Sequence, residues 1–188
     1  MNINDLYSIL LSDKPSINIK DNEEELFKFI PELEKCKGFN QNNDWHIYDV
    51  YEHILHVVDY VDNDIILRLA ALFHDVGKPL TYVEDLNGVG HFYGHWIKSQ
   101  DIFDLFALTH NIADNISFMV SNLILYHDKN IGKLNNYDLN SLYKLFGSNG
   151  IELLFKLKEA DLLAQNSKYH SLLNDYNDQK RKIFTRCR

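Results

Sequence analysis

The chain has 188 residues, of which 45% are hydrophobic, and its formal net charge is −8. This length suits a single domain with a sizeable core, and no stretch approaches the roughly 20 uncharged residues that a membrane helix needs. The acidic balance argues against a broad nucleic-acid surface, and the start of the chain lacks the pattern of a signal segment, so a cytoplasmic protein is expected. Two cysteines, Cys36 and Cys187, show no ligand spacing, so any metal must be held by histidine and carboxylate side chains.

Helical periodicity dominates the chain and strand-like alternation is scarce, which predicts an all-α fold with one domain over residues 1–188. Asp49 and Glu52 form a capping-box pattern ahead of an apolar run. The irregular segment 78–94 is predicted to be a loop beside a site. Helices are expected at residues 4–11, 23–35 with a break at Pro31, 50–61, 64–75, 95–108, 114–127, 138–146, 150–165 and 171–184.

The most informative segment is 65–75, where an apolar helical run interrupted only by Arg68 ends in His74 and Asp75. A carboxylate at the end of a buried helix cannot stay charged without a partner. A divalent cation satisfies both side chains, because imidazole and carboxylate are ligands that zinc, iron, manganese and nickel accept. The adjacent pair therefore points to a metal site.

Two more polar residues lie on helix faces that must pack inward. His127 follows Leu123 by four positions, and Asp161 follows Leu157 by four, each on an apolar stripe. A core histidine bonded to a backbone carbonyl is the alternative for His127. A salt bridge to Arg68 is the alternative for Asp161, because an inward carboxylate needs a partner or a cation.

Two further histidines can join this group. His53 lies between Val50 and Val57 at helical spacing, and His95 opens the helix after the loop, from which its side chain can reach back to a site. The set exceeds one tetrahedral site and suits two adjacent metals with Asp75 bridging. The candidate ligands are His53, His74, Asp75, His95, His127 and Asp161.

The pattern of His53, the His74-Asp75 pair and Asp161 resembles the HD superfamily of metal-dependent phosphohydrolases, which is named after the adjacent pair. The chain is similar to the HD domain attached to bacterial tRNA nucleotidyltransferases over residues 39–166. The segments that carry this similarity are 49–55, 69–79, 91–95 with Ser99, and 160–164. Residues 1–38 are then N-terminal helices and residues 167–188 a C-terminal helix with a basic tail, and nucleotide addition is not implied for a stand-alone HD module.

The resemblance implies an HD-type helical bundle with a metal site between the helices. Superfamily members with the four-ligand set commonly hold one ion, and those with two added histidines hold two. By that similarity His53, His74, Asp75 and Asp161 would hold one ion, and Asp75, His95 and His127 the other. The cofactor is then one or two divalent ions of Mn, Fe, Ni, Co, Zn or Mg.

The reaction implied is metal-assisted hydrolysis of a small phosphate ester, most plausibly a nucleotide, as a phosphomonoesterase or phosphodiesterase. Activated water attacks phosphorus while the metals and Lys78 offset charge on the phosphoryl oxygens. His91 is the candidate proton donor to the leaving group, because imidazole titrates near neutrality. His46, beside Trp45, is a candidate substrate contact or a residue that orients a ligand.

Two other functions stay open. Some HD proteins with the six-ligand set are di-iron oxygenases, which the ligands do not separate from hydrolases. A non-catalytic RNA-binding or regulatory module could use the basic C-terminal cluster, although a solvated helix end explains that cluster more simply and a binding module has no need of an inward Asp161. The cluster comprises Lys168, Lys180, Arg181, Lys182, Arg186 and Arg188.

Overall fold

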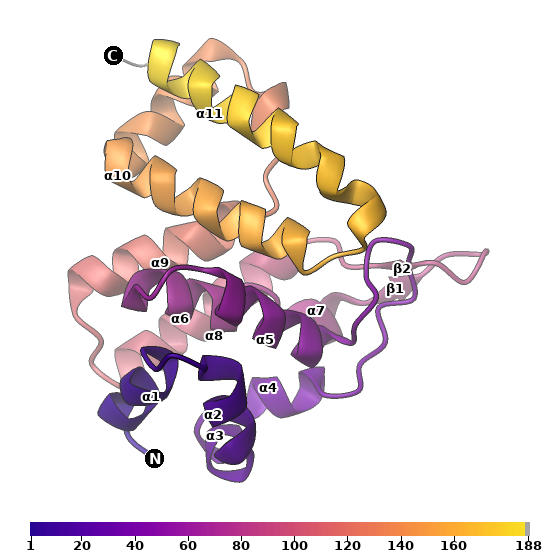
Figure 1. The fold of residues 1–188 in the computed structure, drawn as a ribbon, viewed down its shortest axis with the longest axis vertical. Coiled ribbons are helices and arrows are strands. Elements are labelled where there is room, and N and C mark those ends of the chain that lie inside the picture. Colours follow the sequence, from indigo (N-terminus) through magenta and orange to yellow (C-terminus); the bar gives the residue numbers. More distant parts are fainter. Residues whose placement is uncertain (187–188) are drawn as a thin grey trace.

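Helices make up nearly all regular structure in residues 1–186, the part of the chain that the computed structural model describes, so the all-α prediction is confirmed (Figure 1). Two residues named above, Cys187 and Arg188, lie outside the described part. The helices are α1 (Ile3–Leu10), α2 (Pro15–Asp21), α3 (Glu23–Phe29), α4 (Pro31–Cys36), α5 (Val50–Tyr60), α6 (Ile65–Phe73), α7 (Lys78–Thr81), α8 (His95–Thr109), α9 (Asp114–Tyr126), α10 (Asn136–Leu163) and α11 (Leu173–Arg186), with 3-10 turns η1 (Ile131–Lys133) and η2 (Ser167–Leu172).

Helix α6 lies at the centre of the core. Every residue from Leu67 to Phe73 is buried, including Arg68, the one charged residue in an otherwise apolar helix. Helices α5, α8, α9, α10 and α1 all pack against it. Asp64 caps its N-terminus by accepting from the amides of Ile66 and Leu67. The end of α6 is therefore fixed deep inside the molecule, where His74 and Asp75 follow.

Two local expectations need correction, and a third is confirmed. The segment 15–21 forms a helix, α2, that begins at Pro15 and was not predicted, because seven residues carry too little periodicity. Asp49 does cap α5 by accepting from the Glu52 amide. The Glu52 carboxylate does not return the bond, because it pairs with Lys20 at 2.9 Å. The predicted break at Pro31 is confirmed by separate helices α3 and α4.

The predicted loop 78–94 contains more structure than expected. After α7, strands β1 (Val83–Glu84) and β2 (Gly90–His91) pair antiparallel in a short hairpin that projects from the helices (Figure 1). Asp85 stabilises its turn, because its carboxylate accepts from the amides of Asn87 and Val89, and Gly88 adopts a φ of 79°. Strands of two residues are too short to show alternation in a sequence.

Helices α10 and α11 pack together along one side of the molecule (Figure 1). Gly147, with a φ of 62°, interrupts α10, which agrees with the break expected between 146 and 150. The connection to α11 is held down by an aromatic stack of Trp45 on Tyr169, with ring centroids 3.6 Å apart, and by the Asn166 amide donating to the Trp45 carbonyl at 2.8 Å. The C-terminal segment is thus anchored beside the start of α5.

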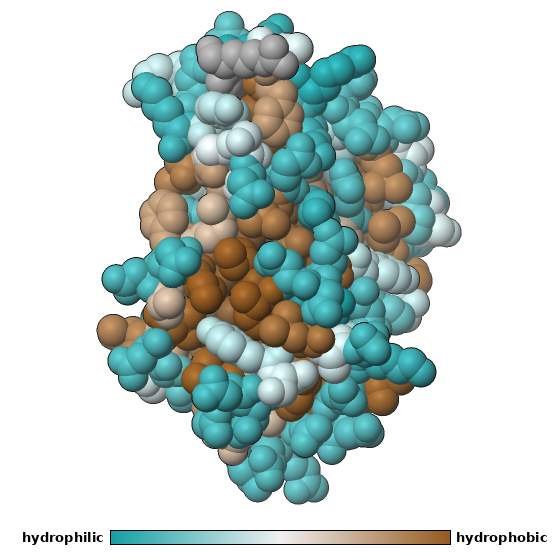
Figure 2. All heavy atoms as spheres, turned by 60° about the vertical axis from the view of Figure 1, so that its left-hand side comes forward, coloured by the Kyte–Doolittle hydropathy of each residue, from teal (hydrophilic) through white to brown (hydrophobic). Residues whose placement is uncertain are grey.

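One face of the molecule has a hydrophobic patch near its middle, bordered by hydrophilic side chains (Figure 2). Apolar area of this kind is common on folded proteins and assigns no partner by itself. None of the helices in residues 1–186 combines the length and the apolar character that crossing a bilayer requires.

Candidate metal centre

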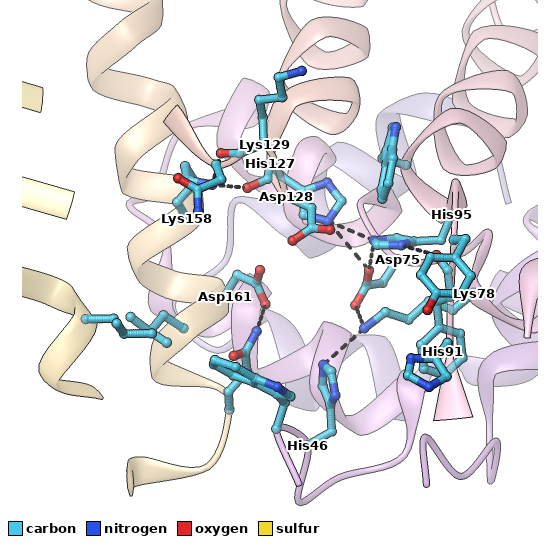
Figure 3. Close-up of a pocket in the computed structure, with 18 of the residues that line it drawn as sticks. His46, Asp75, Lys78, His91, His95, His127, Asp128, Lys129, Lys158 and Asp161 are labelled. Atoms are coloured by element: carbon cyan, nitrogen blue, oxygen red, sulfur yellow. Dashed lines mark hydrogen bonds and ion pairs between the residues drawn. The ribbon is translucent and has the colours of Figure 1, made fainter. Parts of the chain in front are cut away.

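The structure brings all six candidate ligands together. Four of them, Asp75, His95, His127 and Asp161, line a cavity of about 470 Å³ (Figure 3). The six come from separate elements, so the site depends on the packing of the whole bundle. His53 lies on α5, His74 and Asp75 follow α6, His95 opens α8, His127 follows α9, and Asp161 lies near the end of α10. Five of the six are buried, and Asp161 is partly exposed.

Three of the imidazoles are oriented by their own local backbone. Nδ1 of His74 donates to the carbonyl of Ala71 at 2.8 Å, and Nδ1 of His127 donates to the carbonyl of Ile124 at 2.7 Å. His95 donates in the same way to the carbonyl of Phe92 at 2.9 Å. A carbonyl only accepts, so Nδ1 carries the proton in each ring and Nε2 is left with a free lone pair.

Two of these lone pairs face each other, because Nε2 of His95 and Nε2 of His127 are 3.2 Å apart. Two acceptors at this distance repel unless a cation or a proton lies between them. The lone pair of His74 faces Nε2 of His53 at 3.3 Å. Together with the nearby carboxylates they form a set of donors that suits divalent metals, so these residues could hold one or two such ions.

Asp75 occupies the middle of the cluster. Its Oδ2 lies 3.2 Å from Nε2 of His74 and 3.4 Å from Nε2 of His53. Its Oδ1 lies 3.2 Å from Nε2 of His95 and 3.7 Å from Nε2 of His127. The two oxygens therefore face separate pairs of imidazoles, so Asp75 could contact more than one ion if more than one were bound.

Asp161 completes the side of the cluster that holds His53. Its Oδ1 lies 3.1 Å from Nε2 of His53. Burial alone would raise the pKa of Asp161, but its contact with His53 holds this pKa well below its usual range. Burial lowers the pKa of His53, so a neutral imidazole faces an ionised carboxylate, the protonation states that metal binding requires.

The alternative partner for Asp161 is wrong. Arg68 is 5% exposed, and its Nε donates to the carbonyl of Asp62 at 3.1 Å instead. Arg68 makes no ion pair with any described residue. The inward carboxylate of Asp161 instead accepts from Nε2 of Gln165 at 3.1 Å and lies against the imidazole of His53.

Lys78 lies inside the cavity wall and is fully bonded. Its Nζ donates to Oδ2 of Asp75 at 2.6 Å, to Oε1 of Gln41 at 2.8 Å and to Nε2 of His46 at 3.1 Å. Nδ1 of His46 donates in turn to Oδ1 of Asn43 at 2.7 Å. Burial and the Lys78 ammonium lower the pKa of His46 to about 2, which keeps its Nε2 an acceptor. The sequence did not reveal Gln41, which is buried in a loop without periodicity.

His91 lies at the rim of the cavity, about one third exposed, rather than in the cluster (Figure 3). Its Nε2 lies 3.2 Å from Oδ2 of Asp85, and its ring stacks on Tyr93 with centroids 5.4 Å apart. The hairpin thus places His91 on the cavity wall but does not bring it into contact with the candidate ligands.

Lys158 was missed although the sequence carried a signal for it. It precedes Asp161 by three positions and follows Leu154 by four, on the same inward face. Its ammonium donates to the backbone carbonyl of His127 and, at 3.1 Å, to that of Lys129. Through these bonds α10 holds the end of α9, which carries His127, as well as supplying Asp161 itself.

An all-α bundle that gathers histidine and aspartate side chains at its centre is typical of metal-binding helical domains, and comparison with known protein families identifies which one. Residues 44–166 match the HD domain family, so the chain belongs to that family. HD domains are typically metal-dependent phosphohydrolases. The family expected from the His74-Asp75 pattern is therefore confirmed.

Part of the chain is also similar to a characterised protein. Over 72 residues the chain is 39% identical to the A-adding tRNA nucleotidyltransferase of Deinococcus radiodurans. The match covers 35% of this chain and 16% of that protein. The expected similarity to HD domains of tRNA nucleotidyltransferases is thus confirmed, although this chain matches only a small share of the relative.

Proposed function

We propose that this protein hydrolyses a small phosphate ester at a centre of two divalent cations. The observation that carries the proposal is the position of Asp75, whose two oxygens face different imidazole pairs at 3.2–3.7 Å. Pairs of metals about 3.5–4 Å apart recur in enzymes that displace groups at phosphorus. Membership of the HD family supports the same class of reaction.

Divalent cations bound here would supply Lewis acidity and water that loses its proton near neutral pH. The chain's own residues orient this chemistry. His74, His95 and His127 hold their Nε2 atoms toward the centre through Nδ1 bonds to backbone carbonyls. Asp75 is ionised, because the Lys78 ammonium at 2.6 Å opposes the effect of burial and helps to hold the pKa of this carboxyl well below its usual range.

Lys78 and His91 have proposed roles beside the centre. All three donors of Lys78 are engaged, so contact with a phosphoryl oxygen requires that it release one partner. Asp75 is the natural partner to release once cations neutralise that carboxylate. His91, on the cavity wall, is the proposed proton donor to the leaving group.

Metal analysis and a phosphatase screen test this function together. Protein purified without added metal is analysed for Mn, Fe, Co, Ni and Zn, and phosphate release is then measured with a panel of nucleotides and sugar phosphates. Asp75→Ala should lose both bound metal and activity. Asp101→Ala is the matched control, because Asp101 is exposed on α8 and forms an ion pair with Lys98 at the surface.

Hydrolysis that resists a chelator, or that survives in Asp75→Ala, would contradict the proposal. Two bound irons with oxygen consumption and no phosphate release would instead identify an oxygenase. Binding of RNA that is unchanged in Asp75→Ala, without hydrolysis, would identify a binding module.

A further inference from the structure

The cavity continues well beyond the metal centre. Its volume of about 470 Å³ equals the share of liquid volume taken by about sixteen waters, and a phosphoryl group fills only a part of that. Asp75, His95, His127 and Asp161 line it together with Lys78 and His46. A second set of lining residues, here called the outer subsite, comprises Asp128, Leu172, Asp175, Tyr176 and Gln179.

Four of these five residues belong to one helical face. Leu172, Asp175, Tyr176 and Gln179 recur at spacings of three, one and three, so successive turns of η2 and α11 present them to the same side. They lie after residue 166, where the match to the HD family ends. The outer subsite is therefore largely a feature of this chain's own C-terminal segment.

Helix α11 is held firmly in this position. Ile183 is fully buried, and Lys180 forms an ion pair with Glu152 on α10. The Tyr176 ring lies against the Lys158 ammonium at 5.3 Å and meets Phe155 edge-on with centroids 6.4 Å apart. The outer subsite is thus a built wall of the cavity.

The charges on this wall are arranged against anions. The carboxylates of Asp128 and Asp175 form no ion pair or hydrogen bond with any other residue in 1–186. The Lys158 ammonium donates to two backbone carbonyls but keeps its charge near Asp128, which points toward the cavity, whereas the Lys129 side chain points away from Asp75 and Asp161 (Figure 3). Asp175 thus brings to the α11 side of the cavity a carboxylate that no described cation pairs with, while Lys78 lies beside the candidate ligands.

From this arrangement we infer that the outer subsite binds the organic part of the ester, which is uncharged or cationic and carries hydroxyl or amino donors. The inference rests on the proposed function and narrows it. Carboxylates accept hydrogen bonds from such donors and repel a further phosphoryl group, and the Tyr176 ring provides an apolar surface for the carbon skeleton. The substrate thus has one phosphoryl group rather than a chain of them.

The test compares AMP and ribose 5-phosphate with ADP in manganese-loaded protein, by kcat/KM for phosphate release. Wild type should prefer AMP over ADP by at least tenfold and accept ribose 5-phosphate as well. Asp175→Lys should reduce the AMP:ADP ratio at least tenfold, because it replaces a repelling charge by an attracting one. Asp178→Lys makes the same change of charge on an exposed residue of α11, paired with Arg181, and should keep the wild-type ratio.

Because each ratio is taken within one protein, partial loss of folding cancels. A wild type that prefers ADP, or equal ratios in Asp175→Lys and Asp178→Lys, overturns the outer subsite and leaves the hydrolase standing. A wild type that releases phosphate from none of the three probes or the wider panel overturns the proposed function, and the outer subsite falls with it.

Discussion

Replacing Lys158 by methionine measures the cost of a buried ammonium in this fold. Lys158 is 4% exposed, and burial lowers the pKa of its ammonium from 10.5 to about 8 against the opposing charges of Asp128 and Asp161. Below pH 8 both the folded and the unfolded chain carry the charge, and the full cost of about 3 kcal/mol is present. Between pH 8 and 10.5 the unfolded chain binds more protons, so the free energy of unfolding rises with pH.

Methionine does not titrate. As the pH rises, the free energy of unfolding of wild type should therefore increase relative to that of Lys158→Met. The two pKa values give a growth of about 2.5 kcal/mol from pH 7 to pH 10. Urea unfolding of metal-free protein at both pH values measures it, and with a slope of about 2 kcal/mol per molar the midpoints separate by about 1.2 M more at pH 10.

Lys156→Met is the control, because Lys156 lies on the same helix but is exposed and pairs with Asp62. Its difference from wild type should not grow with pH. A constant difference for Lys158→Met across this range would refute the argument that burial depresses the pKa of the Lys158 ammonium.

Three other predictions concern stability. Gly77→Ala should lower the free energy of unfolding by about 3 kcal/mol, because the added Cβ would lie 2.6 Å from the backbone oxygen of His95. Gly132→Ala is the control. Its added Cβ would lie 3.3 Å from the end of a flexible side chain, so the loss in thermal unfolding should be under about 1 kcal/mol. Manganese at about 100 times its dissociation constant should raise the unfolding free energy by about 2.7 kcal/mol, and a urea midpoint that ignores both manganese and chelator would contradict a metal centre. Trp45→Ala removes the stack on Tyr169, so it should lower the free energy of unfolding by about 1 kcal/mol and speed amide hydrogen exchange in segment 166–169. Unchanged exchange in that segment would show that the stack does not hold it in place.

The sequence predicted most helices because their apolar periodicity is long and clear. Helix α6, apolar except for Arg68, is the strongest case, and the interruption of α10 was expected ahead of Gly150. The hairpin of β1 and β2 was not predicted, since its order comes from the Asp85 turn and from contacts outside the strands. For example, the Gly90 amide donates to the Asn42 carbonyl at 2.8 Å. Such long-range bonds leave no periodic trace in the chain.

The gathering of the six candidate ligands followed from inward faces and the family resemblance. What the sequence could not supply was the partner of each polar group. Lys158 lies on a predicted inward face, but its acceptors are backbone carbonyls of another helix, which have no side-chain signature. Lys78 was expected to be available to a phosphate, whereas its three donors are already engaged, one of them by Gln41.

The Nδ1 bonds of His74, His95 and His127 also bear on how such a protein can diverge. Each ring takes its orientation from a carbonyl three residues earlier, and substitution of side chains leaves that carbonyl in place. The orientation of these three rings is therefore set by the local backbone rather than by neighbouring side chains. Residues in the cavity walls, including those of α11, can therefore be substituted to fit a new substrate while the orientation of the candidate ligands is kept. Proteins that share these ligands can thus differ widely in substrate specificity.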